Sequence, residues 1–382
     1  MKRWISLVAA VLILWGVLPM VAGAEGLQIE AKSALLMEAA TGTVLYEQNA
    51  HQALPPASVT KVMTLLLIME AIDSGKLSWQ DTVTASEAAA AKGGSQIFLK
   101  VGETMSVTDM VKAIAISSAN DCACAMAEHI EGSEPAFVEK MNQKAQELGL
   151  TDTHFVNCTG LDDAPDAQEH KTSAYDIGVI SAKLLTEHPD IKQYTTIWMD
   201  TVRDGSFGLS NTNKLVRFYP GCTGLKTGFT SGAGYCLSAS AAREGMELVA
   251  VVMGCETSQK RQAACKTLLD HGFANYALIT PEASREQVTV TLGRDPWVTA
   301  VPAQTGPVLI EKAQKDSVTT HTDLTAAVAA PVSKGQRLGT LTVKAGEQTL
   351  RQIPLVAENP VARLGYWEIL ASVLRAMCMA AP

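Results

Sequence analysis

The chain has 382 residues, of which 47% are hydrophobic, 18% charged and only 5% aromatic, and its formal net charge at pH 7 is -8. This composition excludes a disordered chain and supplies enough apolar residues for about two domains. The acidic balance argues against a nucleic-acid partner.

The first segment predicts export. Lys2 and Arg3 precede an apolar run from Trp4 to Val21, and small residues follow at 22–24. A basic start, an apolar stretch and a small-residue cleavage site are typical of a secretory signal peptide, here residues 1–24. The run is nearly long enough to span a bilayer, so an uncleaved membrane anchor is the alternative. Because the exported chain is acidic, its net charge does not attract it to an anionic membrane surface. Any membrane attachment must therefore come from a local apolar segment.

The cysteines do not predict a metal site or a disulfide scaffold. The chain has 8 Cys, none of them in a Cys-x-x-Cys pair, and no His lies at zinc-finger spacing. Most stand inside apolar runs, which suits small buried side chains, so we expect mostly free thiols. Disulfides are the alternative, since export permits them. No metal and no cofactor are expected.

The segment after the signal peptide predicts a hairpin and then a buried helix. Residues 34–38 and 43–46 have the pattern of two strands joined at Thr41-Gly42. Residues 59–72 are largely apolar, with two prolines before them and Gly75 after them, which indicates a buried helix. Ser58 therefore lies at or just before the N-terminus of that helix.

Two further helices are expected on either side of a polar cluster. Ser106 and Asp109 resemble a capping box at the start of the first helix. Residues 117–121 favour caps and turns, and residues 122–130 resume a helical pattern. We therefore expect Ser118 and Asn120 to lie on a connection between two helices.

The remaining elements indicate the fold class. Helices are predicted over residues 137–148, 173–185 and 259–273. Residues 224–240 have a Gly-rich centre between two extended flanks and predict an antiparallel pair, which a strand over 247–254 joins. An N-terminal hairpin, interposed helices and later strands indicate an α+β fold, in which helices pack against an antiparallel sheet.

The composition changes near Thr280-Pro281. Residues 281–357 alternate apolar and polar side chains between Gly turns, which predicts a small all-β domain. Residues 358–382 predict a helix beginning at Asn359-Pro360, with Trp367 and Leu370 on its apolar face. Its charges disfavour a spanning helix and favour an amphipathic helix at a membrane surface. Docking on its own domain or on a second subunit is the alternative.

Three short motifs carry the candidate chemistry. They are Ser58-Val59-Thr60-Lys61, Ser118-Ala119-Asn120 and Lys226-Thr227-Gly228. On a helix, positions i and i+3 share a face, so the amine of Lys61 lies beside the hydroxyl of Ser58. Each motif alone is weak evidence for a catalytic site. Together the three have the order and the structural settings of one known set of catalytic motifs: a helix start, a connection between helices, and a strand beside a Gly-rich turn.

This set resembles the low-molecular-mass penicillin-binding proteins, which are serine-type D-alanyl-D-alanine carboxypeptidases. The resemblance extends to residues 94–102, 118–121, 148–155 and 160–162, and it covers roughly residues 28–275. It implies a penicillin-binding/β-lactamase-like catalytic domain over residues 25–280. The β domain and the terminal helix resemble that group as well. The implied partners are a peptidoglycan stem peptide ending in D-Ala-D-Ala, β-lactam antibiotics and, through the terminal helix, a membrane surface.

Physical chemistry and the resemblance together predict how the site works. Ser58 is the expected nucleophile, and Lys61 can take its proton only when neutral. The pKa of Lys61 must therefore fall through burial and a nearby cation, for which Lys226 is the candidate. Ser118 can relay a proton to the departing amine.

The resemblance assigns substrate binding to the remaining residues. Asn120 would hold the peptide backbone, and Lys226 and Thr227 on the strand with Gly228 would bind the terminal carboxylate. By analogy with the family, the N–H groups of Ser58 and Phe229 would form the oxyanion hole. Several family members have His where this chain has Phe229. Since only the backbone N–H is needed there, we expect activity to survive, with the substrate preference in doubt.

Three other functions are alternatives for a chain with these motifs. A class A β-lactamase activates its deacylating water with a carboxylate, but the usual Glu-x-x-Leu-Asn pattern does not occur between Asn120 and Lys226. A DD-endopeptidase would share the same machinery. A catalytically silent wall- or membrane-binding protein would be expected to lack the nucleophile, the base or the Lys-Thr-Gly motif, and all three are present.

Overall fold

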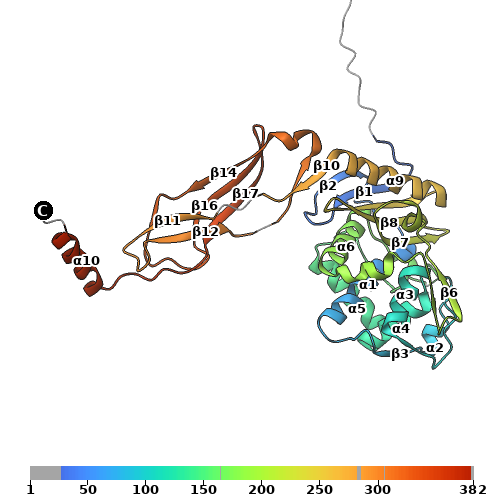
Figure 1. Cartoon of the computed structure of the whole chain (residues 1–382). Coiled ribbons are helices and arrows are strands. Elements are labelled where there is room, and N and C mark those ends of the chain that lie inside the picture. The colour runs from blue at the N-terminus through green and yellow to red at the C-terminus, as the bar shows by residue number, and fades with distance from the viewer. Residues whose placement is uncertain (1–26, 164, 282–284, 305, 380–382) are drawn as a thin grey trace, which may run out of the picture.

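The computed structural model describes residues 27–379, apart from 164, 282–284 and 305. The predicted signal peptide, residues 1–24, lies outside the described residues. Figure 1 shows an α+β unit, an elongated β unit that extends away from it, and helix α10 at the far end of the β unit.

The α+β unit is built on a five-stranded antiparallel sheet with strand order β2-β1-β9-β8-β7. The predicted hairpin is its first pair, and the predicted Gly-rich pair is β7 and β8. The strands are β1 (Ser33–Glu38), β2 (Val44–Gln48), β7 (Cys222–Thr230), β8 (Gly234–Arg243) and β9 (Met246–Cys255). The sheet thus confirms the α+β class predicted from the element order.

Helices cover both faces of this sheet, because successive strand residues point to opposite sides. Leu35 and Met37 of β1 pack in the core with α1 and α6, whereas Leu36 packs in a second core with α9. Figure 1 shows α9 and α6 on opposite sides of the strands. The longer helices are α1 (Lys61–Asp73), α3 (Val107–Ser117), α4 (Asn120–Glu131), α5 (Glu134–Glu147), α6 (Ala174–Glu187) and α9 (Ser258–Asn275).

Short elements complete the unit. The short helices and 3₁₀ turns are η1 (Ala57–Thr60), α2 (Glu87–Ala90), η2 (Ala167–Glu169), η3 (Pro189–Ile191), α7 (Lys192–Thr195) and α8 (Leu215–Phe218). Two small antiparallel pairs join β3 (Thr82–Thr84) to β4 (Thr104–Ser106) and β5 (Met199–Val202) to β6 (Phe207–Ser210).

Local capping explains where the site-bearing elements begin and end. The Ser106 side chain accepts a hydrogen bond from the backbone N–H of Asp109 and caps α3, as predicted. Ser118 ends α3 in the left-handed conformation, with φ of 64°, and α4 begins two residues later at Asn120. Ser58 lies in the 3₁₀ turn η1, directly before α1.

The β unit contains a six-stranded sheet with order β14-β16-β17-β12-β11-β15, in which only the β11–β15 pair is parallel among the described strands. A separate pair joins β10, just after α9, to β13. The elements are β10 (Tyr276–Ile279), β11 (Glu286–Thr291), β12 (Trp297–Pro302), β13 (Val308–Glu311), η4 (Lys312–Ser317), β14 (Val318–Leu324), β15 (Ala327–Ala329), β16 (Arg337–Ala345) and β17 (Gln348–Ala357).

The terminal helix begins later than the sequence predicts. Helix α10 spans Tyr366–Met379, whereas the prediction began it at Asn359-Pro360. Val361 instead exchanges backbone hydrogen bonds with Val332, and the N–H of Leu364 donates to the carbonyl of Leu292. These bonds hold the segment extended against the β unit. None of the helices in the described part of the chain is long and apolar enough to cross a membrane.

Candidate active site

Ser58 and Lys61 form the centre of the candidate site. The Nζ atom of Lys61 lies 2.9 Å from the Oγ of Ser58 and donates to the carbonyl oxygen of Thr159 at 2.7 Å. Lys61 is 0% exposed and forms no ion pair within the described residues. Burial lowers its pKa to about 7, although Cys158 and Asp121 act in the opposite direction. A large fraction of Lys61 is therefore neutral near pH 7 and can accept the hydroxyl proton.

Lys226 lies on β7 and is also buried. Its Nζ donates to the carbonyl oxygen of Thr227 at 2.9 Å. The pKa of Lys226 lies well below its usual range, first because of burial and then because Lys61 and Arg261 repel its charge. For Lys61, the sequence prediction that burial lowers the pKa is confirmed, whereas the predicted contribution of Lys226 as a nearby cation is wrong.

The β7 strand approaches the nucleophile very closely. A Cβ atom added at Gly228 would lie 2.8 Å from the carbonyl oxygen of Pro56 and 3.0 Å from the backbone nitrogens of Ser58 and Val59. Only glycine permits this contact, which explains the last position of the Lys-Thr-Gly motif. Phe229, next along the strand, is 53% exposed, and its ring centre lies 4.3 Å from that of Tyr235.

The corner between α3 and α4 holds two unsatisfied polar atoms. Neither the Oγ of Ser118 nor the Oδ1 of Asn120 has a hydrogen-bond partner among the described residues, although both are buried. The Nδ2 of Asn120 donates to the carbonyl of Gly93 at 2.8 Å, which orients the amide. Buried polar atoms without partners are rare, and a polar substrate would satisfy them.

Thr212 links this corner to the β7 strand. Its backbone N–H donates to the carbonyl of Ile116 at the end of α3. Its Oγ1 accepts a hydrogen bond from the Oγ1 of Thr227 at 2.7 Å. The structure thereby brings the Lys-Thr-Gly strand against both of the other motifs, through Gly228 at Ser58 and through Thr212 at the α3 end.

Several supporting residues are not visible as sequence motifs. Arg261 of α9 is buried and donates to the carbonyl oxygens of Gly228 and Cys236, which places a cation behind the β7 strand. Thr159 supplies the carbonyl that holds Lys61. Arg261 is separated from the Lys-Thr-Gly motif by more than thirty positions, and Thr159 acts through its backbone. Neither therefore produces a local pattern in the sequence.

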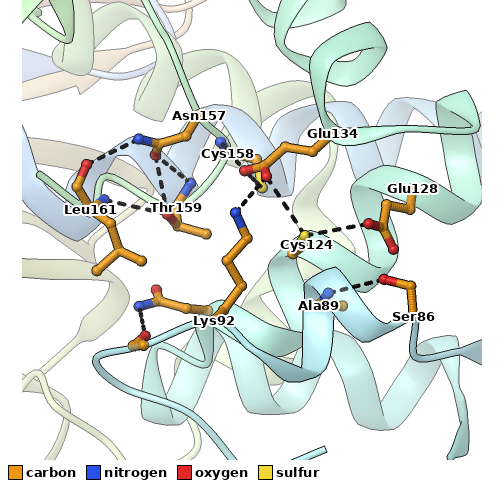
Figure 2. A network of polar contacts seen from close by, with 12 residues as sticks. Ser86, Ala89, Lys92, Cys124, Glu128, Glu134, Asn157, Cys158, Thr159 and Leu161 are labelled. Atoms are coloured by element: carbon orange, nitrogen blue, oxygen red, sulfur yellow. Dashed lines mark hydrogen bonds and ion pairs between the residues drawn. The ribbon is translucent and has the colours of Figure 1, made fainter. Parts of the chain in front are cut away.

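The loop that carries Thr159 is held by the network shown in Figure 2. The Oδ1 of Asn157 accepts a hydrogen bond from the backbone nitrogen of Thr159 (Figure 2). It accepts another from the backbone nitrogen of Gly160. Glu134 accepts one from the backbone N–H of Cys158 at 3.3 Å and pairs with Lys92 at 2.6 Å. The carbonyl that receives Lys61 is thus held in place through its neighbours in the chain.

A half-buried serine hydroxyl beside a buried and partly neutral lysine defines the class of serine hydrolases that use lysine as the general base. Residues 20–257 match the D-alanyl-D-alanine carboxypeptidase family, peptidase family S11. Residues 273–363 match the penicillin-binding protein 5 C-terminal domain.

Individual proteins agree with the family match. The chain is 43% identical over 344 residues to the D-alanyl-D-alanine carboxypeptidase DacF of Bacillus subtilis, with 88% of this chain and 87% of that protein covered. Penicillin-binding protein 5 of Haemophilus influenzae is 32% identical with a TM-score of 0.79, over 88% of this chain and 98% of that one. Ampicillin-bound penicillin-binding protein D2 of Listeria monocytogenes is 33% identical with a TM-score of 0.56, over 65% and 99%.

The chain belongs to the D-alanyl-D-alanine carboxypeptidase family of penicillin-binding proteins. It is a serine-peptidase hydrolase with the α+β fold of that family and a C-terminal β domain. The family resemblance predicted from the three motifs is confirmed.

Proposed function

We propose that Ser58 is the nucleophile and Lys61 the general base of this carboxypeptidase. The single observation that carries the proposal is the 2.9 Å distance between Lys61 Nζ and Ser58 Oγ, at a lysine whose pKa burial lowers to about 7. Lys61 takes the hydroxyl proton as the Ser58 oxygen attacks the carbonyl of the peptide bond between the two D-alanines. D-Ala leaves as an amine, and water then hydrolyses the acyl-enzyme ester.

The neighbouring polar groups suit a peptide that ends in a carboxylate. Lys226 and Thr227 supply hydrogen bonds for the terminal carboxylate of D-Ala-D-Ala, and Arg261 behind their strand supplies positive charge. A bound carboxylate would in turn favour the protonated form of Lys226. Asn120 offers its unpartnered Oδ1 to a peptide N–H, and Ser118 can pass a proton to the departing amine. The N–H groups of Ser58 and Phe229 serve as the oxyanion hole.

β-Lactams mimic the same carbonyl and carboxylate, so the proposal includes covalent capture of penicillin on Ser58. The test is incubation with a labelled penicillin, mass mapping of the adduct, and an assay of D-Ala release from a pentapeptide ending in D-Ala-D-Ala. An adduct on the peptide containing Ser58 together with D-Ala release supports the proposal. Rapid turnover of penicillin without D-Ala release would instead indicate a β-lactamase.

The Lys226→Ala variant should lower kcat/KM for the pentapeptide by about ten- to a hundredfold, mainly by raising KM. The substitution removes a hydrogen-bond donor from the proposed carboxylate site. Burial, and not Lys226, lowers the pKa of Lys61, so the pH dependence of the variant should keep its rise near pH 7. Steady-state kinetics between pH 6 and about 10 measure both effects.

The matched control is Lys171→Ala. Lys171-Thr172-Ser173 shares two of the three motif residues, but the Lys171 side chain is exposed. This variant should retain wild-type KM and pH dependence. An unchanged KM in Lys226→Ala itself would remove Lys226 from the site.

We also propose that the enzyme is exported by residues 1–24 and held at the outer face of the cytoplasmic membrane by α10. Tyr366 and Trp367 are 73% and 76% exposed, and Leu370 and Leu374 are also exposed. Apolar side chains of this size each contribute roughly 1.5–3 kcal/mol when fully buried, so a few could hold an acidic protein at a bilayer. The β unit separates α10 from the active site (Figure 1). It would therefore set the height of the active site above the lipid.

Truncation after Gly365, which removes α10 and keeps the extended segment on the β unit, should release the enzyme into the soluble fraction with unchanged activity on small peptides. The full-length Trp367→Glu variant should weaken membrane binding without removing the helix, whereas Glu368→Gln should leave it intact. Cofractionation with membranes and D-Ala release measure the two properties. A truncated protein that stays on membranes rejects the anchor, and loss of small-peptide activity points to a docking role for α10.

A further inference from the structure

His170 lies outside the three motifs, directly after η2 and shortly before α6. It is 3% exposed, and both ring nitrogens have partners. Its Nδ1 accepts a hydrogen bond from the backbone N–H of Val156 at 3.0 Å. A backbone N–H can only donate, so Nδ1 carries no proton and the proton of the neutral ring lies on Nε2.

The Nε2 proton starts a chain of hydrogen bonds that ends beside the nucleophile. Nε2 donates to the Oγ1 of Thr60 at 2.7 Å, and the hydroxyl of Thr60 donates to the carbonyl oxygen of Ala57 at 2.8 Å. The directions of these hydrogen bonds are consistent: Nε2 donates to Thr60, and Thr60 donates to Ala57. His170 thus acts on the carbonyl of the residue that precedes Ser58.

The backbone at Ala57 is strained and tightly enclosed. Ala57 has a φ of 49°, a left-handed conformation that costs energy for a residue with a Cβ. On the far side, a Cβ atom added at Gly160 would lie 1.8 Å from the Ala57 oxygen and 2.8 Å from Thr60 Oγ1. The Ala57 carbonyl is therefore held in one orientation by Thr60 and by the Gly160 backbone.

That carbonyl and the N–H of Ser58 belong to the same peptide unit. The unit is trans and planar, so its C=O and N–H point in opposite directions. Fixing the carbonyl toward Thr60 directs the Ser58 N–H the other way, on the side where the β7 strand passes at Gly228. This N–H is one of the two donors of the proposed oxyanion hole.

We propose that His170 is a positioning residue for the oxyanion hole, which acts through Thr60 on the Ala57–Ser58 peptide unit; this inference rests on the proposed function of Ser58. His170 touches neither substrate nor reacting atoms. Its chain of hydrogen bonds both orients the peptide unit and polarises it, since successive hydrogen bonds strengthen one another.

The electrostatic surroundings agree with a neutral ring. Burial lowers the pKa of His170 to about 4, with smaller contributions in the same direction from His154 and Lys61, while Asp166 opposes them. The ring is thus uncharged at neutral pH, and Nδ1 remains able to accept the Val156 N–H.

Two substitutions separate the role of each ring nitrogen. In His170→Asn the amide oxygen can replace Nδ1 as the acceptor for Val156, but the donor to Thr60 is lost. In His170→Gln the longer amide can replace the Nε2 donor. Thr60→Val removes the hydroxyl from the middle of the chain with little change of shape. The control is His188→Asn, since His188 is another buried histidine, bonded to Asp73 at the opposite end of α1.

The measurements are the second-order rate of acylation by a labelled penicillin, KM for the pentapeptide, and the inhibition constant of a peptide boronic acid, whose tetrahedral adduct carries an oxygen in the oxyanion hole. We expect His170→Asn and Thr60→Val to slow acylation and weaken boronate binding by about ten- to a hundredfold, with KM changed by less than about threefold. His170→Gln should recover most of the rate. The double variant should be no slower than the slower single one.

A wild-type enzyme that is not labelled on Ser58 would refute the proposed function itself. If the wild type is labelled, acylation within about twofold of wild type in both His170→Asn and Thr60→Val overturns the positioning role. Failure of His170→Gln to exceed His170→Asn, or full additivity in the double variant, overturns it as well. Equal loss in His188→Asn would mean that the effect is one of general stability.

Discussion

The Ser58→Ala variant should lose penicillin labelling and D-Ala release completely, a fall of at least about 10⁴-fold, while its melting temperature stays within a few degrees of wild type. The hydroxyl is the atom that forms the acyl-enzyme, and nothing else in the site can replace it. Ser58 is half-buried, and within the described part of the chain its side chain forms a hydrogen bond only with Lys61, so the loss of the hydroxyl costs little stability. Intact-mass spectrometry and thermal unfolding measure the two effects.

The control for this variant is Ser74→Ala, at the other end of α1. The Ser74 hydroxyl donates to the carbonyl of Ala71 and caps the helix, far from the candidate site. The Ser74→Ala variant should be labelled by penicillin at the wild-type rate. Covalent labelling that persists in Ser58→Ala would overturn the assignment of the nucleophile.

Lys61→Met should reduce the acylation rate by about 10³-fold or more with the fold preserved. Methionine has a similar length and fills the buried site, but it cannot accept the Ser58 proton. In the wild type, kcat/KM should rise with pH through about 7, because burial lowers the pKa of Lys61 to about 7 and only the neutral amine is a base. Acylation kinetics from pH 5 to about 9 test the profile.

The same lysine also makes the stability of the fold depend on pH. The pKa of Lys61 is lower in the folded protein than its ordinary value of 10.5, so the unfolded chain binds more protons between pH 7 and 10.5. Stability from this group therefore rises with pH across that window, by an amount on the order of a few kcal/mol. Lys61→Met should be at least as stable as wild type at pH 7 and should lack this contribution. If Lys61→Met is still acylated at the wild-type rate, Lys61 is excluded as the base.

Local sequence patterns were sufficient for much of the fold. The cap at Ser106 and the Gly-rich turn after β7 act within a few residues, so their spacing predicted the elements beside them. The start of α10 was predicted wrongly for the same reason. Asn359-Pro360 is a valid local helix start, but hydrogen bonds from Val361 to a distant strand segment prevent it.

The three motifs, their order and hence the family can be recognised from the sequence alone, because residues that act over one turn or one strand leave a short pattern. The pKa values and hydrogen-bond partners of those residues depend on the tertiary structure. The pKa of Lys61 follows from burial by elements far away in the chain, and its carbonyl partner, Thr159, is 98 positions distant. Arg261 and His170 reach the site only through long-range packing. Desolvation and hydrogen-bond geometry depend on which segments are in contact in the folded protein. Contacts between segments far apart in the chain leave no local pattern in a single sequence.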